Sequence, residues 1–374
     1  MNAPQFFMNS ARRRDDAVVR PPIAPLAFHR RLPGYAPTPL VDAPRLADEL
    51  GLGALAVKDE SERLGLPAFK ILGASWATYR LLVSRLGHEP QWHDLDGLRT
   101  ALAPLGELTL VAATDGNHGR AVAHVARLLG FRSHIFVPAG TAPARIEGIE
   151  EEGAGVTVVD GTYEDAVAAS AALASDTVLV VSDTSWAGYT DVPRTVIEGY
   201  DTIFAETDEQ LDAPPEIVVV PMGVGALATA TVAHYGSSAS VAVVEPLNAA
   251  CGLRSAEAGK PVTVPGPHTS IMAGLNCGEV SIVAWPRLYA GVDVFIAIDD
   301  SAAERGMRDL AGIGIVSGET GAASLAGLRA LVDAGPVDPR GKRALVICTE
   351  GATDPSAYER IVGHAPWRRG DHRQ

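Results

Sequence analysis

The sequence predicts an α/β protein built on mostly parallel, twisted sheets flanked by helices. From about Leu108 onward, short β-branched runs alternate with helix-length segments, and Gly- or Pro-containing turns separate them. Of the 374 residues, 47% are hydrophobic, 6% are aromatic and 38 are glycine. This composition is typical of helices packed closely on a sheet. Alternating strands and helices favour parallel strands joined by right-handed crossovers.

Each element follows from its own pattern, in chain order. The helix at His118–Leu129 is predicted by apolar residues at helical spacing, and the strands by continuous apolar runs bounded by turns. Helices are also expected around Ala142–Glu152, at Tyr163–Ala174, near Pro193–Ala205 and twice between the last two strands. The first 25 residues or so and Trp367–Gln374 are expected to be solvated tails. The predicted strands are Leu108–Ala113, Ser133–Val137, Val156–Val159, Val178–Val181, Ile217–Val220, Val241–Val244, Val294–Ile298 and Ala344–Ile347.

Charge and cysteine content exclude several classes of protein. The net charge of −14 disfavours a nucleic-acid partner, because phosphate binding needs basic patches. No apolar run reaches the ~18 residues of a membrane span, and no signal-peptide segment follows the N-terminal arginines. A soluble, cytoplasmic protein is therefore expected. Cys251, Cys277 and Cys348 form neither a disulfide scaffold nor a zinc motif, and no catalytic metal is expected.

A lysine opens the first candidate loop. Lys70 lies between Phe69 and Ile71 at the predicted start of a helix. Partial desolvation there favours the neutral, nucleophilic amine. A lysine that extends to the surface from a helix end has the same local pattern.

The second loop, Ala113–Gly119, connects a strand to a helix. Backbone N–H groups at that helix N-terminus suit a substrate carboxylate. Asn117 can bind a phenolic oxygen, and Asp115 is a candidate base. A simple N-capping turn would use the same two side chains.

The third loop, Val220–Ala228, is glycine-rich and also precedes a helix, which suits a phosphate. Gly223-x-Gly225-x-x-Ala228 with Glu245 further on also fits a dinucleotide fingerprint, so an NAD(P)-dependent oxidoreductase is an alternative. Against it, the fingerprint normally lies in the first βαβ unit.

The fourth loop lies at the end of the last strand, at Cys348 and Thr349, where a thiol or hydroxyl can face a pyridine nitrogen.

In this order, the four loops resemble the fold-type II pyridoxal-phosphate (PLP) enzymes, the superfamily of the tryptophan synthase β-subunit and threonine dehydratase. Within it, the chain is most similar to the diaminopropionate ammonia-lyase family. The similarity runs from about Phe28 to Ile361. The matching segments are Pro33–Leu40, Lys58–Ser61, Ala68–Gly73, Ala113–Gly119, Asp183–Thr190, Ser270–Gly274, Ser317–Gly321 and Thr349–Pro355.

The resemblance implies how the cofactor, pyridoxal 5′-phosphate, is held. Lys70 would be the Schiff-base lysine, and Asn117 would contact the ring hydroxyl. Either Cys348 or Thr349 would face the pyridine nitrogen, although the family usually has Ser where Cys348 stands. The phosphate would be bound by the backbone of Gly223, Val224, Gly225, Ala226 and Leu227.

The resemblance also implies the reaction, an α,β-elimination from D- or L-2,3-diaminopropionate that gives pyruvate and ammonia. Asp115 stands where simple hydroxy amino acid dehydratases have Ser, and it suits a substrate with a β-amine. Asp183 is the second acid, and Lys70 or Asp115 would remove the α-proton. Thr114, Asp115, His118, Asp183 and Tyr189 would bind the substrate. Elimination or replacement on another β-substituted amino acid, as in serine or threonine dehydratases, is an alternative, and a non-catalytic sensor is a further one.

For architecture, the resemblance implies a large domain of residues 1–87 and 188–374, a small mobile domain of residues 88–187, and a homodimer. Cys251 and Cys277 match positions that hold cysteines in some relatives, where they could be free thiols or a disulfide.

Overall fold

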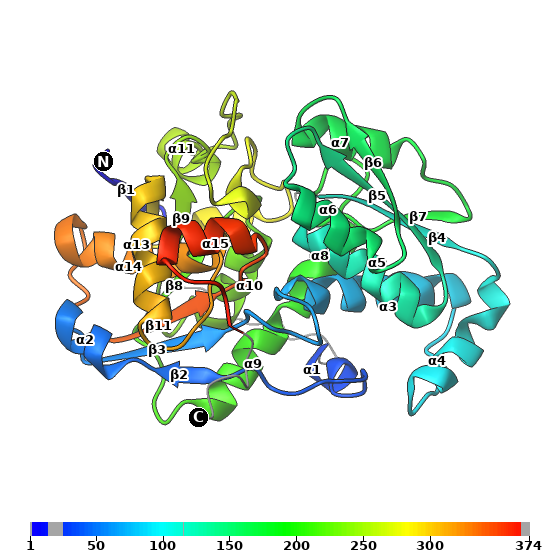
Figure 1. The fold of residues 1–374 in the computed structure, drawn as a ribbon, viewed down its shortest axis with the longest axis horizontal. Helices are drawn as coiled ribbons and strands as arrows, with labels where there is room; N and C mark the ends of the chain where they lie inside the picture. The colour runs from blue at the N-terminus through cyan, green and yellow to red at the C-terminus, as the bar shows by residue number, and fades with distance from the viewer. Residues whose placement is uncertain (1, 14–24, 115, 368–374) are drawn as a thin grey trace.

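The protein consists of two sheets, each flanked by helices, that lie side by side (Figure 1). The structure, a computed structural model, describes residues 2–13, 25–114 and 116–367. None of the helices within these ranges has the length and apolarity that crossing a membrane requires. The predicted α/β class is confirmed.

The larger sheet has seven strands in the order β1-β10-β9-β8-β11-β3-β2. Its two edge pairs, β1 with β10 and β2 with β3, are antiparallel, whereas the inner pairs are parallel. The strands are β1 (Gln5–Met8), β2 (Leu40–Asp42), β3 (Ala54–Asp59), β8 (Ile217–Pro221), β9 (Ser240–Pro246), β10 (Val294–Ile298) and β11 (Arg343–Cys348).

The smaller sheet has four strands in the order β6-β5-β4-β7, and all of its pairs are parallel. Every strand predicted from an apolar run is present, within two residues at each end. The strands are β4 (Thr109–Ala113), β5 (Arg132–Pro138), β6 (Gly155–Val159) and β7 (Val178–Val180).

Helices connect the strands and cover both sheets. Most of them follow a strand directly, as expected for parallel crossovers. The helices are α1 (Pro25–His29), α2 (Pro44–Leu50), α3 (Lys70–Leu86), α4 (Leu95–Leu102), η1 (Ala103–Leu105), α5 (Asn117–Leu129), α6 (Pro143–Glu150), α7 (Tyr163–Ala171), α8 (Asp191–Gly199), α9 (Asp201–Gln210), α10 (Ala226–Tyr235), α11 (Cys251–Ala258), η2 (Ala273–Leu275), α12 (Trp285–Gly291), α13 (Asp300–Ala311), α14 (Glu319–Ala334) and α15 (Pro355–Val362).

Two expectations are corrected. The helix predicted near Pro193–Ala205 is two helices, α8 and α9, which meet at Tyr200. The break turns the fully buried Tyr200 ring onto Phe69, with 4.7 Å between the ring centroids. The N-terminal tail is not wholly solvated, because β1 pairs with the edge of the seven-stranded sheet. Residues 14–24 and 368–374 of the two predicted tails lie outside the described residues.

Three large apolar cores and one small one hold the sheets and helices together. Val219 packs on one face of the seven-stranded sheet with α13 and α14, and Val218 and Val220 pack on the other face with α10. The core of the four-stranded sheet includes residues of α5 and also of α3, such as Trp76 and Tyr79. The predicted domain boundary at residue 88 stays a prediction. The helix that precedes it, α3, packs in the core of the four-stranded sheet.

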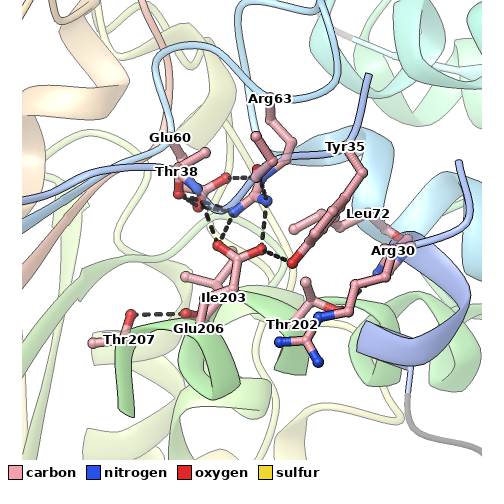
Figure 2. A network of polar contacts seen from close by, with 12 residues as sticks. Arg30, Tyr35, Thr38, Glu60, Arg63, Leu72, Thr202, Ile203, Glu206 and Thr207 are labelled. Carbon is pink, nitrogen blue, oxygen red and sulfur yellow. Dashed lines mark hydrogen bonds and ion pairs between the residues drawn. The ribbon is translucent and has the colours of Figure 1, made fainter. Parts of the chain in front are cut away.

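A buried network of charges joins α9 to the loop that leads from β3 to Lys70 (Figure 2). The guanidinium of Arg63 binds Glu206 at 2.6 Å and also binds Glu60. Lys58 Nζ lies 2.9 Å from Glu206, and all four side chains are fully buried. Burial alone would raise the pKa of Glu206, but Arg63 and Lys58 outweigh it and lower the pKa to about 2. The network therefore fixes the loop that precedes the candidate lysine.

Candidate active site

A cavity of about 810 Å³ is lined by residues that follow strands of both sheets. Its walls come from loops at the carboxyl ends of parallel strands, where ligands of such sheets bind. Thr114 and Asn117 follow β4, Asp183 follows β7, and the loop at 221–227 follows β8. The segments that follow β5 and β6 (138–142 and 161–164), the segment 263–279, and residues at the start of α14 and after β11 complete the lining. The predicted strand-to-helix loops thus converge on one site.

Lys70 opens α3 and projects its amine into this cavity. Nζ donates to Asp183 Oδ2 at 2.7 Å, and the Lys70 side chain is 20% exposed. The same nitrogen lies 5.5 Å from the centre of the Phe69 ring. Lys70 is therefore a cavity residue with a defined carboxylate partner, and not a surface lysine.

Asp183 is buried between two basic groups. Besides Lys70, His118 Nδ1 lies 3.9 Å from Asp183 Oδ2. Burial would raise the pKa of Asp183, but the charges of Lys70 and His118 and the Lys70 hydrogen bond outweigh it. The pKa of Asp183 therefore lies well below its usual range, and the carboxylate is ionised at neutral pH.

His118 keeps one ring nitrogen available toward the cavity. Nε2 pairs with Val181 O at 2.8 Å, and that carbonyl can only accept, so Nε2 carries a proton. Nδ1 is buried and has no hydrogen-bond partner among the described residues. Since His118 lines the cavity, this nitrogen is available to a ligand there.

The glycine-rich loop fits a phosphate. α10 begins at Ala226, and no side chain of the described residues caps it. The first N–H groups of α10 therefore lack an intrahelical partner, and they lie in the segment Gly223–Leu227 that lines the cavity. Gly225 has φ +101°, which a side chain would strain, and a Cβ there would lie 2.6 Å from Leu288. This geometry is compatible with the phosphate that the sequence predicts at this loop.

Of Cys348 and Thr349, only Thr349 lines the cavity. Its Oγ1 is buried without a hydrogen-bond partner among the described residues, an arrangement that calls for a ligand. Cys348 packs into the apolar core beneath the seven-stranded sheet, and its Sγ contacts Glu350 O at 3.6 Å. Burial raises the pKa of the Cys348 thiol well above its usual value. These observations favour Thr349 as the partner of a pyridine nitrogen.

Asn117 crosses the cavity to the larger sheet. Its Nδ2 donates to Glu350 Oε2. Glu350 directly follows Thr349 and is buried at the cavity wall. The sequence motif contained Glu350, but reasoning from the sequence assigned it no role. Thr114, also predicted for the site, lines the cavity and accepts from Gly116 N through Oγ1 at 2.9 Å.

One predicted substrate-binding residue of the described structure, Tyr189, does not line the cavity. Tyr189 uses its hydroxyl to donate to Val180 O and to accept from Ser182 N, and its ring stacks on Trp186. These contacts hold the turn after β7 that carries Asp183. Asp115 lies outside the described residues.

Glu245, the acid of the dinucleotide alternative, is committed elsewhere. It is fully buried and accepts from Gly252 N and Leu253 N at the start of α11. It therefore has no exposed carboxylate for a ribose.

Cys251 and Cys277 carry thiols and are not joined in a disulfide bond. Cys251 Sγ lies 3.9 Å from Gly223 O.

Comparisons with known proteins agree with this geometry. A family model described as pyridoxal-phosphate dependent enzyme matches residues 31–350. The diaminopropionate ammonia-lyase of Salmonella typhimurium (strain LT2) is 36% identical over 365 residues, covering 90% of each chain. A crystal structure of the Escherichia coli diaminopropionate ammonia lyase in complex with D-serine has a TM-score of 0.88 at 33% identity, covering 96% of each chain. The same enzyme with an aminoacrylate-PLP azomethine reaction intermediate has a TM-score of 0.86 at 33% identity and the same coverage.

Proposed function

The chain belongs to the pyridoxal-phosphate-dependent enzymes, in the diaminopropionate ammonia-lyase family, and on this premise we propose that it converts 2,3-diaminopropionate and water to pyruvate and two molecules of ammonia. It is a carbon–nitrogen lyase whose cofactor is pyridoxal 5′-phosphate. The observation that carries the substrate proposal is the contact between Lys70 Nζ and the ionised Asp183 in the cavity.

The residues present fit the cofactor. Lys70 would hold it covalently, the loop Gly223–Leu227 would bind its phosphate, and Asn117 would contact its ring hydroxyl. Thr349 Oγ1, which has no hydrogen-bond partner among the described residues, would donate to the pyridine nitrogen and leave it uncharged. When bound, pyridoxal phosphate supplies an electron sink for the substrate α-carbon.

Lys70 and Asp183 would divide the proton and charge movements between them. Lys70 Nζ takes the proton from the substrate α-carbon, and the carboxylate 2.7 Å away stabilises the resulting ammonium. Asp183 also pairs with the β-ammonium of the substrate. This pairing keeps the group protonated, and it departs as neutral ammonia with the electrons of the Cβ–N bond. The released enamine hydrolyses to pyruvate and the second ammonia.

His118 would also contact the β-ammonium of the substrate. When the ring carries only the Nε2 proton, which Val181 O accepts, its Nδ1 can accept a hydrogen from the substrate's β-ammonium. Two acceptors, one from Asp183 and one from His118, would then face the leaving group. This arrangement favours an amine over a hydroxyl at the β-carbon.

Asp115 is the proposed base on the face opposite Lys70, so both enantiomers of the substrate would react. The proposal rests on the resemblance, because Asp115 lies outside the described residues. We expect D115N to lose activity on one enantiomer of 2,3-diaminopropionate by at least about 100-fold while retaining the other. Equal losses on both enantiomers would remove Asp115 from this role.

The substrate assignment is tested with the purified enzyme and a panel of amino acids. Pyruvate and ammonia are measured from D- and L-2,3-diaminopropionate, and keto acid from L-serine and L-threonine at the same concentrations. We expect release in a 1:2 ratio from at least one diaminopropionate enantiomer, with kcat/KM well above that for the hydroxy amino acids. Preference for serine or threonine would favour the dehydratase alternative.

We also propose that the enzyme is a homodimer that works in the cytoplasm. The support is the family resemblance. Sedimentation of the holoenzyme tests the assembly, and a species of about twice the 39.0 kDa chain mass is expected.

A further inference from the structure

Glu350 meets three parts of the site at once. Its Oε2 accepts from Asn117 Nδ2, at the start of α5 beside the smaller sheet. Its Oε1 accepts from Thr320 N at 3.1 Å, at the start of α14. Its backbone forms an isolated bridge with Ala68, two residues before Lys70. Glu350 is 1% exposed, so these contacts form inside the protein at the cavity wall.

Two glycines provide the space that Glu350 occupies. A Cβ at Gly318 would lie 2.9 Å from Glu350 Oε1, and a Cβ at Gly321 would lie 2.5 Å from Glu350 O. Real Cβ atoms do not approach other atoms so closely. The segment Ser317–Gly321 is therefore shaped around the Glu350 side chain and backbone.

Two N–H donors converge on the carboxyl group of Glu350. Asn117 Nδ2 donates to one oxygen and Thr320 N donates to the other. The Asn117 atom that contacts Glu350 is therefore the amide nitrogen, because a carboxylate oxygen accepts and an amide oxygen cannot donate. The nearby Glu319 is buried as well, and burial, with the charge of Glu350 as a second cause, raises the pKa of Glu319 to about 7.

We propose that Glu350 is a positioning residue that fixes the amide of Asn117, so that its nitrogen and not its oxygen is turned toward the cofactor's ring. The proposal rests on the proposed function, because it takes the contact between Asn117 and the ring hydroxyl from there. The Asn117 nitrogen has two hydrogens, one for Glu350 and one for the ring oxygen. Without Glu350, nothing in the described contacts distinguishes the two ends of the amide.

E350Q tests the proposal because it keeps the side-chain shape and replaces one acceptor oxygen by a donor NH2 group. The single amide oxygen of the introduced glutamine satisfies the backbone donor Thr320 N, and its NH2 group then faces Asn117. Asn117 must turn its oxygen to that group. We expect E350Q to bind pyridoxal phosphate about tenfold to a hundredfold more weakly, measured by titration of the apoenzyme. The visible maximum of the bound cofactor, or the pH midpoint of that band, is expected to shift.

The double variant N117D/E350Q separates positioning from simple bridging. The introduced glutamine can donate to the introduced aspartate, so the bridge re-forms and the thermal midpoint of the apoenzyme is expected to return to that of the wild type. The aspartate offers only acceptors to the ring oxygen, so weak cofactor binding and the shifted spectrum are expected to persist. If the double variant regained wild-type affinity and spectrum, Glu350 would be a bridge only and the proposal would be wrong.

E152Q is the matched control, because Glu152 is another buried carboxylate that holds α5, through His124 and Arg127. It is expected to lower stability without changing cofactor affinity. N117A, which keeps Glu350, tests the same contact if E350Q does not fold, and it is expected to bind the cofactor more weakly and to shift its visible maximum. Wild-type binding by N117A or by E350Q would overturn the proposal. Diaminopropionate turnover by the wild type is measured separately, so failure of the proposed function remains distinguishable.

Discussion

Asp183 gives Lys70 a partner whose charge persists through the neutral range. Its pKa lies below its usual range because Lys70 and His118 outweigh the cost of burial. In the apoenzyme, the stability from this ionised carboxylate is present above its unfolded pKa of about 3.9 and is lost as the pH falls through the lower folded pKa. Asp183 therefore acts as a fixed anion, and not as an acid that titrates near neutrality.

Replacing this anion tests its role. D183N keeps the shape but cannot balance a substrate ammonium, so kcat on diaminopropionate is expected to fall by about 10²- to 10⁴-fold. The visible absorbance of the cofactor is expected to persist, because Lys70 and the phosphate loop remain. D191N, at an acid whose side chain is 96% exposed, is the control and should match the wild type. A D183N variant with kcat within twofold of the wild type would contradict the assignment.

The sequence predicted which loops form the site, but not how their side chains pair. Lys70 and Asp183 are 113 residues apart, and only the fold places their atoms 2.7 Å from each other. The choice between Cys348 and Thr349 depends on which side of β11 faces the core, which two adjacent residues do not reveal. The sequence assigned no role to Glu350, because its partner Asn117 is 233 residues away and no local pattern identifies such a contact.

At the scale of elements, the Arg63 network fixes the loop before Lys70 (Figure 2). R63M would leave Glu60 and Glu206 buried without their main cation, so the free energy of unfolding is expected to fall by about 3–5 kcal/mol. R63K, which keeps the charge but not the planar fork, should lose less.

Denaturant unfolding of the apoenzyme measures this effect. R30A removes an exposed pair with Glu209 and is the control, with an expected change of about 0–1 kcal/mol. If R63M were no less stable than R30A, the network would not be what holds this loop.

His234 joins α9 to α10, the helix that follows the glycine-rich loop. Its Nδ1 and Nε2 bind Asp201 at 2.7 Å and Asp208 at 2.8 Å, and Asp208 also accepts from Tyr235. Burial lowers the pKa of His234, but the hydrogen bonds and charges of the two aspartates outweigh it and raise the pKa from 6.5 to about 9. The stabilisation is thus complete below pH 6.5 and is lost as the pH rises through 9.

H234Q is therefore expected to be less stable than the wild type by up to about 3 kcal/mol at pH 6, since one pKa unit corresponds to about 1.4 kcal/mol. The difference should shrink between pH 7 and pH 10. Unfolding of the apoenzymes across this range measures it, with H88Q, at an exposed histidine, as the control. A difference that does not depend on pH would mean that His234 is not charged in the folded protein.

Strands were easier to predict than helix boundaries. Apolar runs such as Ile217–Val220 in the predicted core are buried on both faces, and their length alone identifies them. The division between α8 and α9 is marked in the sequence only by Gly199, the last residue of α8, and the next residue, Tyr200, packs against Phe69. β1 was missed because its four residues pair only with a distant edge, β10.

At the scale of the whole molecule, the cavity lies between the two sheets, and the predicted domain boundary at residue 88 follows α3, which packs in the core of the four-stranded sheet. Buried residues of α3, among them Ile71, Trp76, Tyr79 and Leu82, belong to the core of the four-stranded sheet. A fragment of residues 88–187 would expose the face that α3 covers. We expect it to show no cooperative thermal transition by circular dichroism, whereas a cooperative transition would support the boundary at 88.

The central claim is that Lys70 holds the cofactor, and covalent labelling tests it most directly. The chain has four lysines, and of these only Lys70 lines the cavity; Lys58 is paired with Glu206, and Lys260 is exposed. The holoenzyme is reduced with borohydride and digested, and the pyridoxyl group is located by mass spectrometry. The account predicts the label on Lys70 alone. A label on Lys58, Lys260 or Lys342, or no label on a protein that binds the cofactor, would contradict it.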